Sequence, residues 1–358
     1  MIQSTRSIGK TLLPVLFSIL VCLVHHYRLS LSAYPSGWDA YFYLIQVKAM
    51  VEEGAMHSPD SSPIYFLLKW LSQLTGDYES GFQLLCASMA ALFTLVMSGL
   101  VLRLTSNNWL AFATGLYCLG SPTLAFFAAN FPKNLLGIDF FLLLLFFSLQ
   151  KKVVGTGISL ALSAISHRMT AGLGLLFLGM KALTIRRLFV LLLGGLVLFG
   201  ASLLVPGLIH LSDLARFEDA FTGTLQIPHY SFVQLLDLSN NQPFWVAEIT
   251  LGLVCWIGMI IDWILRSKAT TGFPGWYRGL LFLTLILFFP FLSMDMTSIG
   301  YRFFLTGMLF TPLWVASLLE HRSLGINLVF GILLVFGSIW GMGHINTSQY
   351  DPDYARYE

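Results

Sequence analysis

Charged residues are scarce in this chain of 358 residues, at 11% of the sequence, whereas hydrophobic residues make up 56%. Soluble globular proteins carry about 25% charged residues, so this chain has too few to cover a surface exposed to water. The shortage excludes a water-soluble enzyme, and the composition also excludes disordered and collagen-like chains. A net charge of +2 is too small to indicate nucleic-acid binding.

Paired cysteine motifs are also missing. The four cysteines, Cys22, Cys86, Cys118 and Cys255, all lie in apolar runs, and none belongs to a CxxC or Cys/His pattern. Cysteines in such surroundings behave as small hydrophobic residues, so we expect neither a disulfide framework nor a zinc site. We find no clear internal repeat, which weakens an inverted-repeat transporter interpretation.

Apolar runs that approach or reach the roughly 20 residues needed to cross a bilayer recur along the chain. The first run is followed by bulky, partly cationic residues at 25–28 rather than by a small-residue cleavage site, so we expect an uncleaved helix. The pattern predicts an all-α polytopic membrane protein with about 11 transmembrane helices in a single integral membrane domain, 1–358. The predicted spans are about 8–24, 82–103, 109–129, 134–149, 154–166, 169–183, 187–206, 245–265, 276–293, 300–319 and 323–341.

The distribution of lysine and arginine orients these spans. With a cytoplasmic N-terminus, more of the cations fall on the inner side and most acids fall on the outer side. About 11 spans then place the C-terminus outside. Two long outer loops then cover 25–81 and 206–243. The first loop contains apolar helical patterns over 39–54 and 62–74, which we expect to lie on the outer leaflet.

The sharpest candidate for chemistry is the acid that follows the first span. Asp39 comes directly after Trp38 and begins the first apolar pattern of the outer loop. An aspartate in this position caps a helix by accepting backbone N–H bonds, or it acts as a catalytic carboxylate. The residues alone leave both interpretations open.

Three further outer side chains are candidate substrate-binding groups. His57 and Asp60 lie in a stretch rich in serine and proline, which favours a turn and a helix start. Alternatively, these two side chains bind an acceptor hydroxyl or a metal. Lys133 lies at the start of the fourth span, where it is either an interfacial lysine with its ammonium in water or a phosphate contact.

His167 and Arg168 separate two apolar stretches that are short for a membrane crossing. As a helix, 154–166 covers about 20 Å, against a hydrocarbon thickness of about 30 Å. We therefore expect the turn to stop below the outer surface, where Arg168 lines a wet cavity or meets an anion. The alternative is one long kinked helix in which Arg168 pairs with an acid such as Asp139.

Tyr301 and Arg302 open a later apolar span on the predicted outer side. They form either an interfacial anchor, with Asp295 as the partner of Arg302, or a phosphate site. A guanidinium suits phosphate because it donates two parallel hydrogen bonds to it.

Asp39, His57, Lys133, Arg168 and Arg302 share the predicted outer side of one helix bundle. A carboxylate that faces several cations there suits the transfer of a sugar from a lipid phosphate to an acceptor hydroxyl or amine. The cations stabilise the phosphate as its charge develops. The carboxylate accepts the proton of the nucleophile or helps to hold a divalent metal.

With these features the chain resembles the GT-C superfamily of polytopic membrane glycosyltransferases, which includes protein mannosyltransferases, aminoarabinose transferases and oligosaccharyltransferases. The matching features are the Trp38-Asp39 pair, the amphipathic helix and Pro-containing loop that follow it, and Tyr301-Arg302-Phe303-Phe304 at the start of a helix that includes Pro312. The resemblance implies that Asp39 is the essential acid and that Arg302 contacts the donor phosphate.

The resemblance also implies the partners and the location. They are a polyprenyl-phosphate sugar donor, membrane lipid and an acceptor glycan, lipid or protein, in a membrane such as the bacterial inner membrane. The sequence departs from the family where Ala40 replaces a paired acid and where no DxD motif stands between the third and fourth spans.

Three alternatives remain open. A lipid or sugar transporter or flippase needs an ionisable or broken-helix site near the membrane midplane. An O-antigen polymerase or ligase would share Arg168 and Arg302 but would not require Asp39. A non-catalytic membrane partner would use these groups only to anchor helices.

Overall fold

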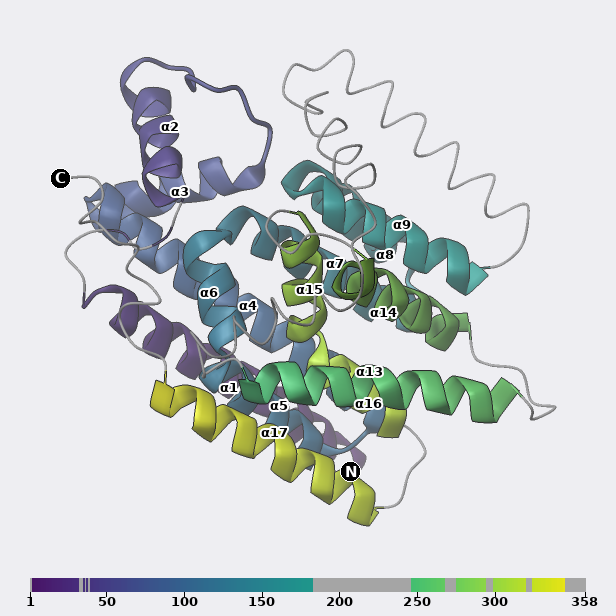
Figure 1. Ribbon diagram of the computed structural model, residues 1–358. Helices are drawn as coiled ribbons and strands as arrows, with labels where there is room; N and C mark the ends of the chain where they lie inside the picture. Colours follow the sequence, from purple (N-terminus) through teal and green to yellow (C-terminus); the bar gives the residue numbers. More distant parts are fainter. Residues whose placement is uncertain are drawn as a thin grey trace. The chain divides into compact units, whose positions relative to one another are not determined.

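The computed structural model describes residues 2–31, 35, 37, 39–182, 246–267, 275–293, 299–319 and 324–344. Trp38, Asp295, the predicted span at 187–206 and the predicted outer loop at 206–243 lie outside this part of the chain. Helix is the only regular structure within these ranges, which contain no strand (Figure 1). The all-α class is therefore confirmed.

The described helices fall into two compact units, the first from Met1–Gly172 and Leu319–Glu358 and the second from Leu173–Leu318. The first unit contains α1 (Ile2–Leu29), α2 (Ala40–Glu52), α3 (Pro63–Thr75), α4 (Tyr78–Thr105), α5 (Asn108–Gly120), α6 (Pro122–Asn130), α7 (Pro132–Leu149), α8 (Val153–Ser166) and α17 (Leu324–His344). The second contains α13 (Val246–Ser267), α14 (Gly275–Ser293), α15 (Ile299–Leu309) and α16 (Thr311–Leu319, except its last residue). The division falls inside α9 (Arg168–Ala182), whose first turn belongs to the first unit.

Four of the described helices are long and apolar enough to cross a membrane. They include the segments Leu12–Leu29, Tyr78–Thr105, Pro132–Leu149 and Glu248–Leu265. Two bent pairs, α5 with α6 at 54° and α15 with α16 at 48°, raise the number to six if each pair is one span. These are the helices of a multi-pass membrane protein.

The predicted count of about 11 spans is not confirmed, and helix length is one reason. The predicted spans at 154–166 and 169–183 correspond to α8 and α9, which have 14 and 15 residues. Both are shorter than the roughly 20 residues that a crossing needs. Two other predicted spans are bent next to a proline in the first turn of the second helix, at Pro122 and Pro312.

Within the first unit, α4 is the central helix and packs against α1, α3, α5 and α7. Its side chains are buried along most of its length, including Phe82 and Phe93. A helix that is apolar on all sides belongs in the interior of a bundle. Close packing also joins α5 to α1, because a Cβ on Gly115 would lie 2.3 Å from the Phe17 ring.

Local sequence determines where the helices near the candidate site begin and end. Pro63 and Pro132 stand in the first turns of α3 and α7, where a residue without an N–H is favoured. Gly76 ends α3 in the left-handed conformation, with φ of 75°. The extended backbone of His167 ends α8, and α9 begins at Arg168.

Candidate functional site

Asp60 and Lys133 connect the loop before α3 to the start of α7. One oxygen of the Asp60 carboxylate forms an ion pair with the Lys133 ammonium. The other oxygen accepts a hydrogen bond from the Ser62 N–H at 2.8 Å. The two charged side chains are only 17% and 25% exposed. Asp60 therefore forms the predicted turn, and Lys133 has a carboxylate partner rather than reaching freely into water.

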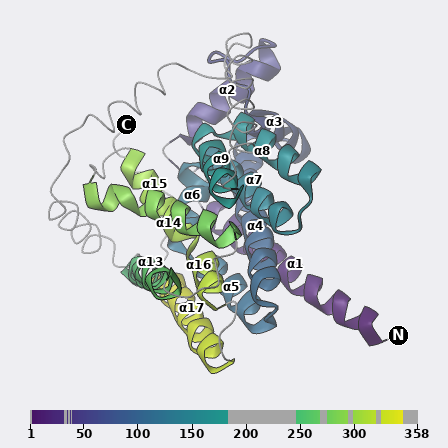
Figure 2. The same ribbon diagram turned by 90° about the vertical axis from the view of Figure 1, so that its right-hand side faces the viewer.

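The start of α3 also contacts the junction between α8 and α9. The Ser62 hydroxyl donates to the Ser166 carbonyl at 3.3 Å, although the two residues are 104 positions apart. On the other side, the Ser163 hydroxyl donates to the Gly137 carbonyl of α7 at 3.3 Å, and a Cβ on Gly137 would lie 2.6 Å from the His167 Cβ. The start of α3 therefore lies near α7 and the α8–α9 junction, and α3, α7 and α8 contact one another (Figure 2).

Asp39 reaches the same region through two buried tyrosines. The ring centroids of Tyr43 and Tyr65 are 5.6 Å apart. Burial raises the pKa of the Tyr43 phenol well above its usual value, and Tyr65, Asp39 and Asp60 raise it further. Burial likewise raises the pKa of the Tyr65 phenol, and the carboxylates of Asp60 and Asp39 add to this effect. Both acids act on both phenols, so Asp39 and Asp60 lie near one tyrosine pair.

Gly37 holds the backbone before Asp39 against the end of α6. Its φ of 115° lies in the region that favours glycine, and a Cβ there would lie 2.0 Å from the Ala129 carbonyl oxygen. Because α6 ends directly before α7, this contact brings the Asp39 segment to the end of the bundle where Lys133 lies.

The capping interpretation of Asp39 is wrong. Asp39 occupies the N-cap position of α2, but its side chain makes no capping hydrogen bond there. A true cap in the same unit is Asp77, whose carboxylate accepts from the Ser80 N–H at 2.7 Å. The Asp39 carboxylate therefore does not cap its own helix.

Arg168 adds a second cation. Burial lowers the pKa of its guanidinium, and the Asp60 carboxylate opposes that shift. The predicted alternative partner, Asp139, is fully buried, and neither of its carboxylate oxygens bonds to any residue in the described part of the chain. The pairing of Arg168 with Asp139 is therefore wrong, and so is the single kinked helix, because His167 interrupts it.

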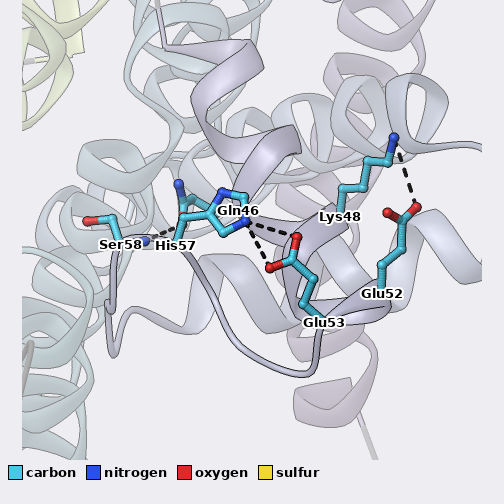
Figure 3. A network of polar contacts seen from close by, with 6 residues as sticks. All are labelled: Gln46, Lys48, Glu52, Glu53, His57 and Ser58. Carbon is cyan, nitrogen blue, oxygen red and sulfur yellow. Dashed lines mark hydrogen bonds and ion pairs between the residues drawn. The ribbon is translucent and has the colours of Figure 1, made fainter.

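We call Asp39, Asp60, Lys133 and Arg168, with the Tyr43–Tyr65 pair, the acid–cation cluster. His57 is not part of this cluster. Its Nε2 atom lies 3.0 and 3.1 Å from the two carboxylate oxygens of Glu53, and its side chain is 55% exposed (Figure 3).

The same surface turn is held by the Ser58 N–H, which donates to the Gln46 side chain at 2.8 Å. His57 thus belongs to the exposed turn after α2. The structure gives no support to its predicted contact with substrate.

The remaining predicted residues lie in two places. His167 stands at the α8–α9 break, next to Arg168. Tyr301 and Arg302 lie in the first turn of α15, in the second unit, where the Arg302 carbonyl accepts a hydrogen bond from Thr306 at 2.7 Å. That Tyr301 and Arg302 join the acid–cation cluster stays a prediction from the sequence.

Two residues of the cluster were missed by sequence reasoning. Tyr43 and Tyr65 count as apolar positions in a helical pattern, which hides their phenols. The sequence held one signal for Tyr43, because Tyr43 follows Asp39 by four residues. In the structure the Tyr43 N–H donates to the Asp39 carbonyl at 3.2 Å. Residues with this spacing share a helix face.

Asp39 and Asp60 are the residues of the cluster that could contact a divalent metal. Among the described residues, no group of three or more His, Cys, Asp and Glu side chains is arranged to hold a metal ion. A magnesium ion commonly takes several ligands from water and from substrate phosphates. A metal at this place would need further ligands from water or from a substrate phosphate.

Comparison with family models, with curated proteins and with solved structures found no match. A proposal for the function of the chain is therefore based on the chemistry of the acid–cation cluster. The cluster combines carboxylates, cations and helix starts at one end of the first unit.

Proposed function

We propose that this chain is a membrane glycosyltransferase that moves a sugar from a polyprenyl-phosphate-linked donor to an acceptor on the extracytoplasmic face. One observation carries the proposal: Asp60 pairs with Lys133 and acts on Arg168, and Asp39 acts on the same two tyrosines as Asp60. The chain also has four to six described helices that are long and apolar enough to cross a membrane. Charges are costly in such surroundings, so their convergence calls for a ligand.

In the proposed reaction, the acceptor hydroxyl attacks the anomeric carbon of the donor sugar. The bond between that carbon and the phosphate oxygen breaks, and the phosphate leaves with the electron pair. Asp39 accepts the proton of the acceptor hydroxyl. Lys133 and Arg168 stabilise the charge that develops on the phosphate, and the buried tyrosines strengthen this attraction by excluding water.

The two acids take different roles. Both oxygens of Asp60 are engaged, one by the Ser62 N–H and the other by Lys133. Asp60 therefore balances the charge of Lys133 in the free protein, and we assign the role of the base to Asp39.

The proposal is tested by donor consumption in vesicles that contain the purified chain. Polyprenyl-phosphate-linked hexoses and pentoses serve as donors, with a membrane extract as the source of acceptor. Lys133→Ala and Arg168→Ala should each lower the rate about 10²–10³-fold, as the loss of a charge-stabilising donor does elsewhere. Lys48→Ala is the matched control, because Lys48 is 61% exposed. If none of the hexose or pentose donors is consumed, the chain is not this transferase.

A second candidate function, transport of a lipid or sugar, is favoured by Asp139. This acid lies within the membrane-crossing helix α7, fully buried and without a partner among the described residues. Ionisable residues inside membrane helices commonly mark ion or substrate pathways. The two bent helix pairs also fit a transporter.

Asp139→Asn separates the two candidates in the same vesicles. A transporter that couples to a proton or cation at Asp139 would lose uptake of the lipid-linked sugar in this variant. The transferase should keep its rate within about twofold, because a neutral side chain of the same shape replaces a residue that takes no part in the proposed transfer.

A further inference from the structure

Two helices of the first unit begin with cations, at the end where a helix dipole disfavours them. Lys133 stands in the first turn of α7, and Arg168 is the first residue of α9. The start of a helix is its positive end and stabilises anions instead. An anion held between these two helix starts would interact favourably with both cations and both dipoles.

Two buried side chains near these helix starts have a polar atom without a partner in the described residues. Asn134 is 5% exposed, and its amide nitrogen Nδ2 makes no hydrogen bond. Ser166 is 1% exposed, and its hydroxyl makes none. Buried polar atoms are nearly always satisfied, so unsatisfied groups near these helix starts suit the binding of a ligand or of water.

Helix geometry directs both side chains to the place where α9 begins. Asn134 precedes Gly137 by three residues and so shares its face of α7. Gly137 abuts His167, the residue directly before α9. Ser166 follows Ser163 by three residues, and the Ser163 hydroxyl reaches the Gly137 carbonyl. From this spacing we infer that the Asn134 amide and the Ser166 hydroxyl face the junction between α7 and the start of α9.

Asp60 provides the negative charge at this place in the free protein. Its carboxylate pairs with Lys133 and also acts on Arg168, where it opposes the effect of burial. An incoming anion would compete with Asp60 for the same two cations.

We propose that Lys133, Asn134, Ser166 and Arg168 form a subsite for a phosphate monoester or diester, with Asp60 as its competing counter-ion. The Asn134 amide and the Ser166 hydroxyl donate hydrogen bonds to the phosphate oxygens, and the cations balance its charge. Where the phosphate belongs to a lipid donor, the inference rests on the proposed glycosyltransferase function. Free inorganic phosphate has the same recognisable chemistry.

The test is binding by the full-length chain in detergent, with polyprenyl phosphate, polyprenol and inorganic phosphate as probes. Polyprenyl phosphate should bind at least about tenfold more tightly than polyprenol. Asn134→Asp should weaken binding of polyprenyl phosphate about 10- to 100-fold, because it replaces a donor to a charged group by an acid. The fold should tolerate this change, since an acid is favourable in the first turn of a helix.

Asp60→Asn should act in the opposite direction and tighten phosphate binding about two- to fivefold, because the competing charge is removed. If Asn134 and Asp60 served only the fold, their variants would not change phosphate binding in opposite directions. The matched control is Asn107→Asp at the start of α5, where the side chain accepts from the Trp109 N–H at 2.9 Å. This variant should bind polyprenyl phosphate as the parent chain does.

Equal affinities for polyprenyl phosphate and polyprenol would overturn the proposal, as would unchanged binding in Asn134→Asp or weaker binding in Asp60→Asn. Displacement of the lipid by millimolar inorganic phosphate would show that free phosphate suffices, whereas its failure to displace the lipid assigns the subsite to a lipid headgroup. Phosphate binding without sugar transfer would keep the subsite and remove the transferase. If the chain transfers sugar but Asn134→Asp binds polyprenyl phosphate as tightly as the parent chain, the transferase function stands and the subsite is wrong.

Discussion

Asp39→Asn is expected to lower the rate of sugar transfer about 10²–10⁴-fold while the protein stays folded. Asparagine has nearly the shape of aspartate but cannot accept the proton of the acceptor hydroxyl. It is also an equally good residue at the start of a helix, and Asp39 makes no capping hydrogen bond that could be lost. The measurements are the initial rate of donor consumption and the thermal unfolding of the purified variant.

The matched control for this variant is Asp77→Asn. Asp77 also precedes a helix of the first unit, and hydrogen bonds with Glu79 and Ser80 lower its pKa to about 2. Asp77→Asn replaces an acid by its amide, as Asp39→Asn does, but at an exposed position outside the cluster. Its rate should stay within about twofold of the parent chain. Full activity in Asp39→Asn would remove Asp39 from the mechanism.

Gly37→Ala is expected to destabilise the first unit by about 2–5 kcal/mol and to reduce sugar transfer in the fraction that folds. The added Cβ would lie 2.0 Å from the Ala129 carbonyl oxygen, so the backbone before Asp39 must move away from α6. The φ of 115° adds strain for any residue with a side chain. Denaturant unfolding and the donor-consumption rate measure the two effects.

Gly54→Ala separates the strain from the clash. Gly54 has a φ of 82°, also unfavourable for alanine, but no atom lies within 4 Å of its added Cβ. This control should lose only about 1 kcal/mol and keep its transfer rate. If Gly37→Ala behaved in the same way, the contact with α6 would not be what positions Asp39.

The helical membrane class could be predicted because long apolar runs are visible in any sequence of this length. The number of spans could not, because composition does not distinguish a short apolar helix from one that crosses. The helix α8 is apolar but has 14 residues, and the run at 109–129 is bent at Pro122 into α5 and α6.

Individual charges of the candidate site were visible for a physical reason: a charge in an apolar chain is costly and therefore conspicuous. Their partners were not visible, because tertiary contacts decide them. Asp60 and Lys133 are 73 residues apart and form an ion pair, whereas Arg168 does not pair with Asp139 as one alternative proposed.

The central claim is that the loop before α3 and the α8–α9 junction belong to one site. The most direct test is a disulfide cross-link in the double variant Ser62→Cys/Ser166→Cys, made after Cys22, Cys86, Cys118 and Cys255 are replaced. Because the Ser62 hydroxyl lies 3.3 Å from the Ser166 carbonyl, mild oxidation should join the two positions within one chain, as seen after protease cleavage between them. Two thiols that oxidise separately without forming this link would contradict the account.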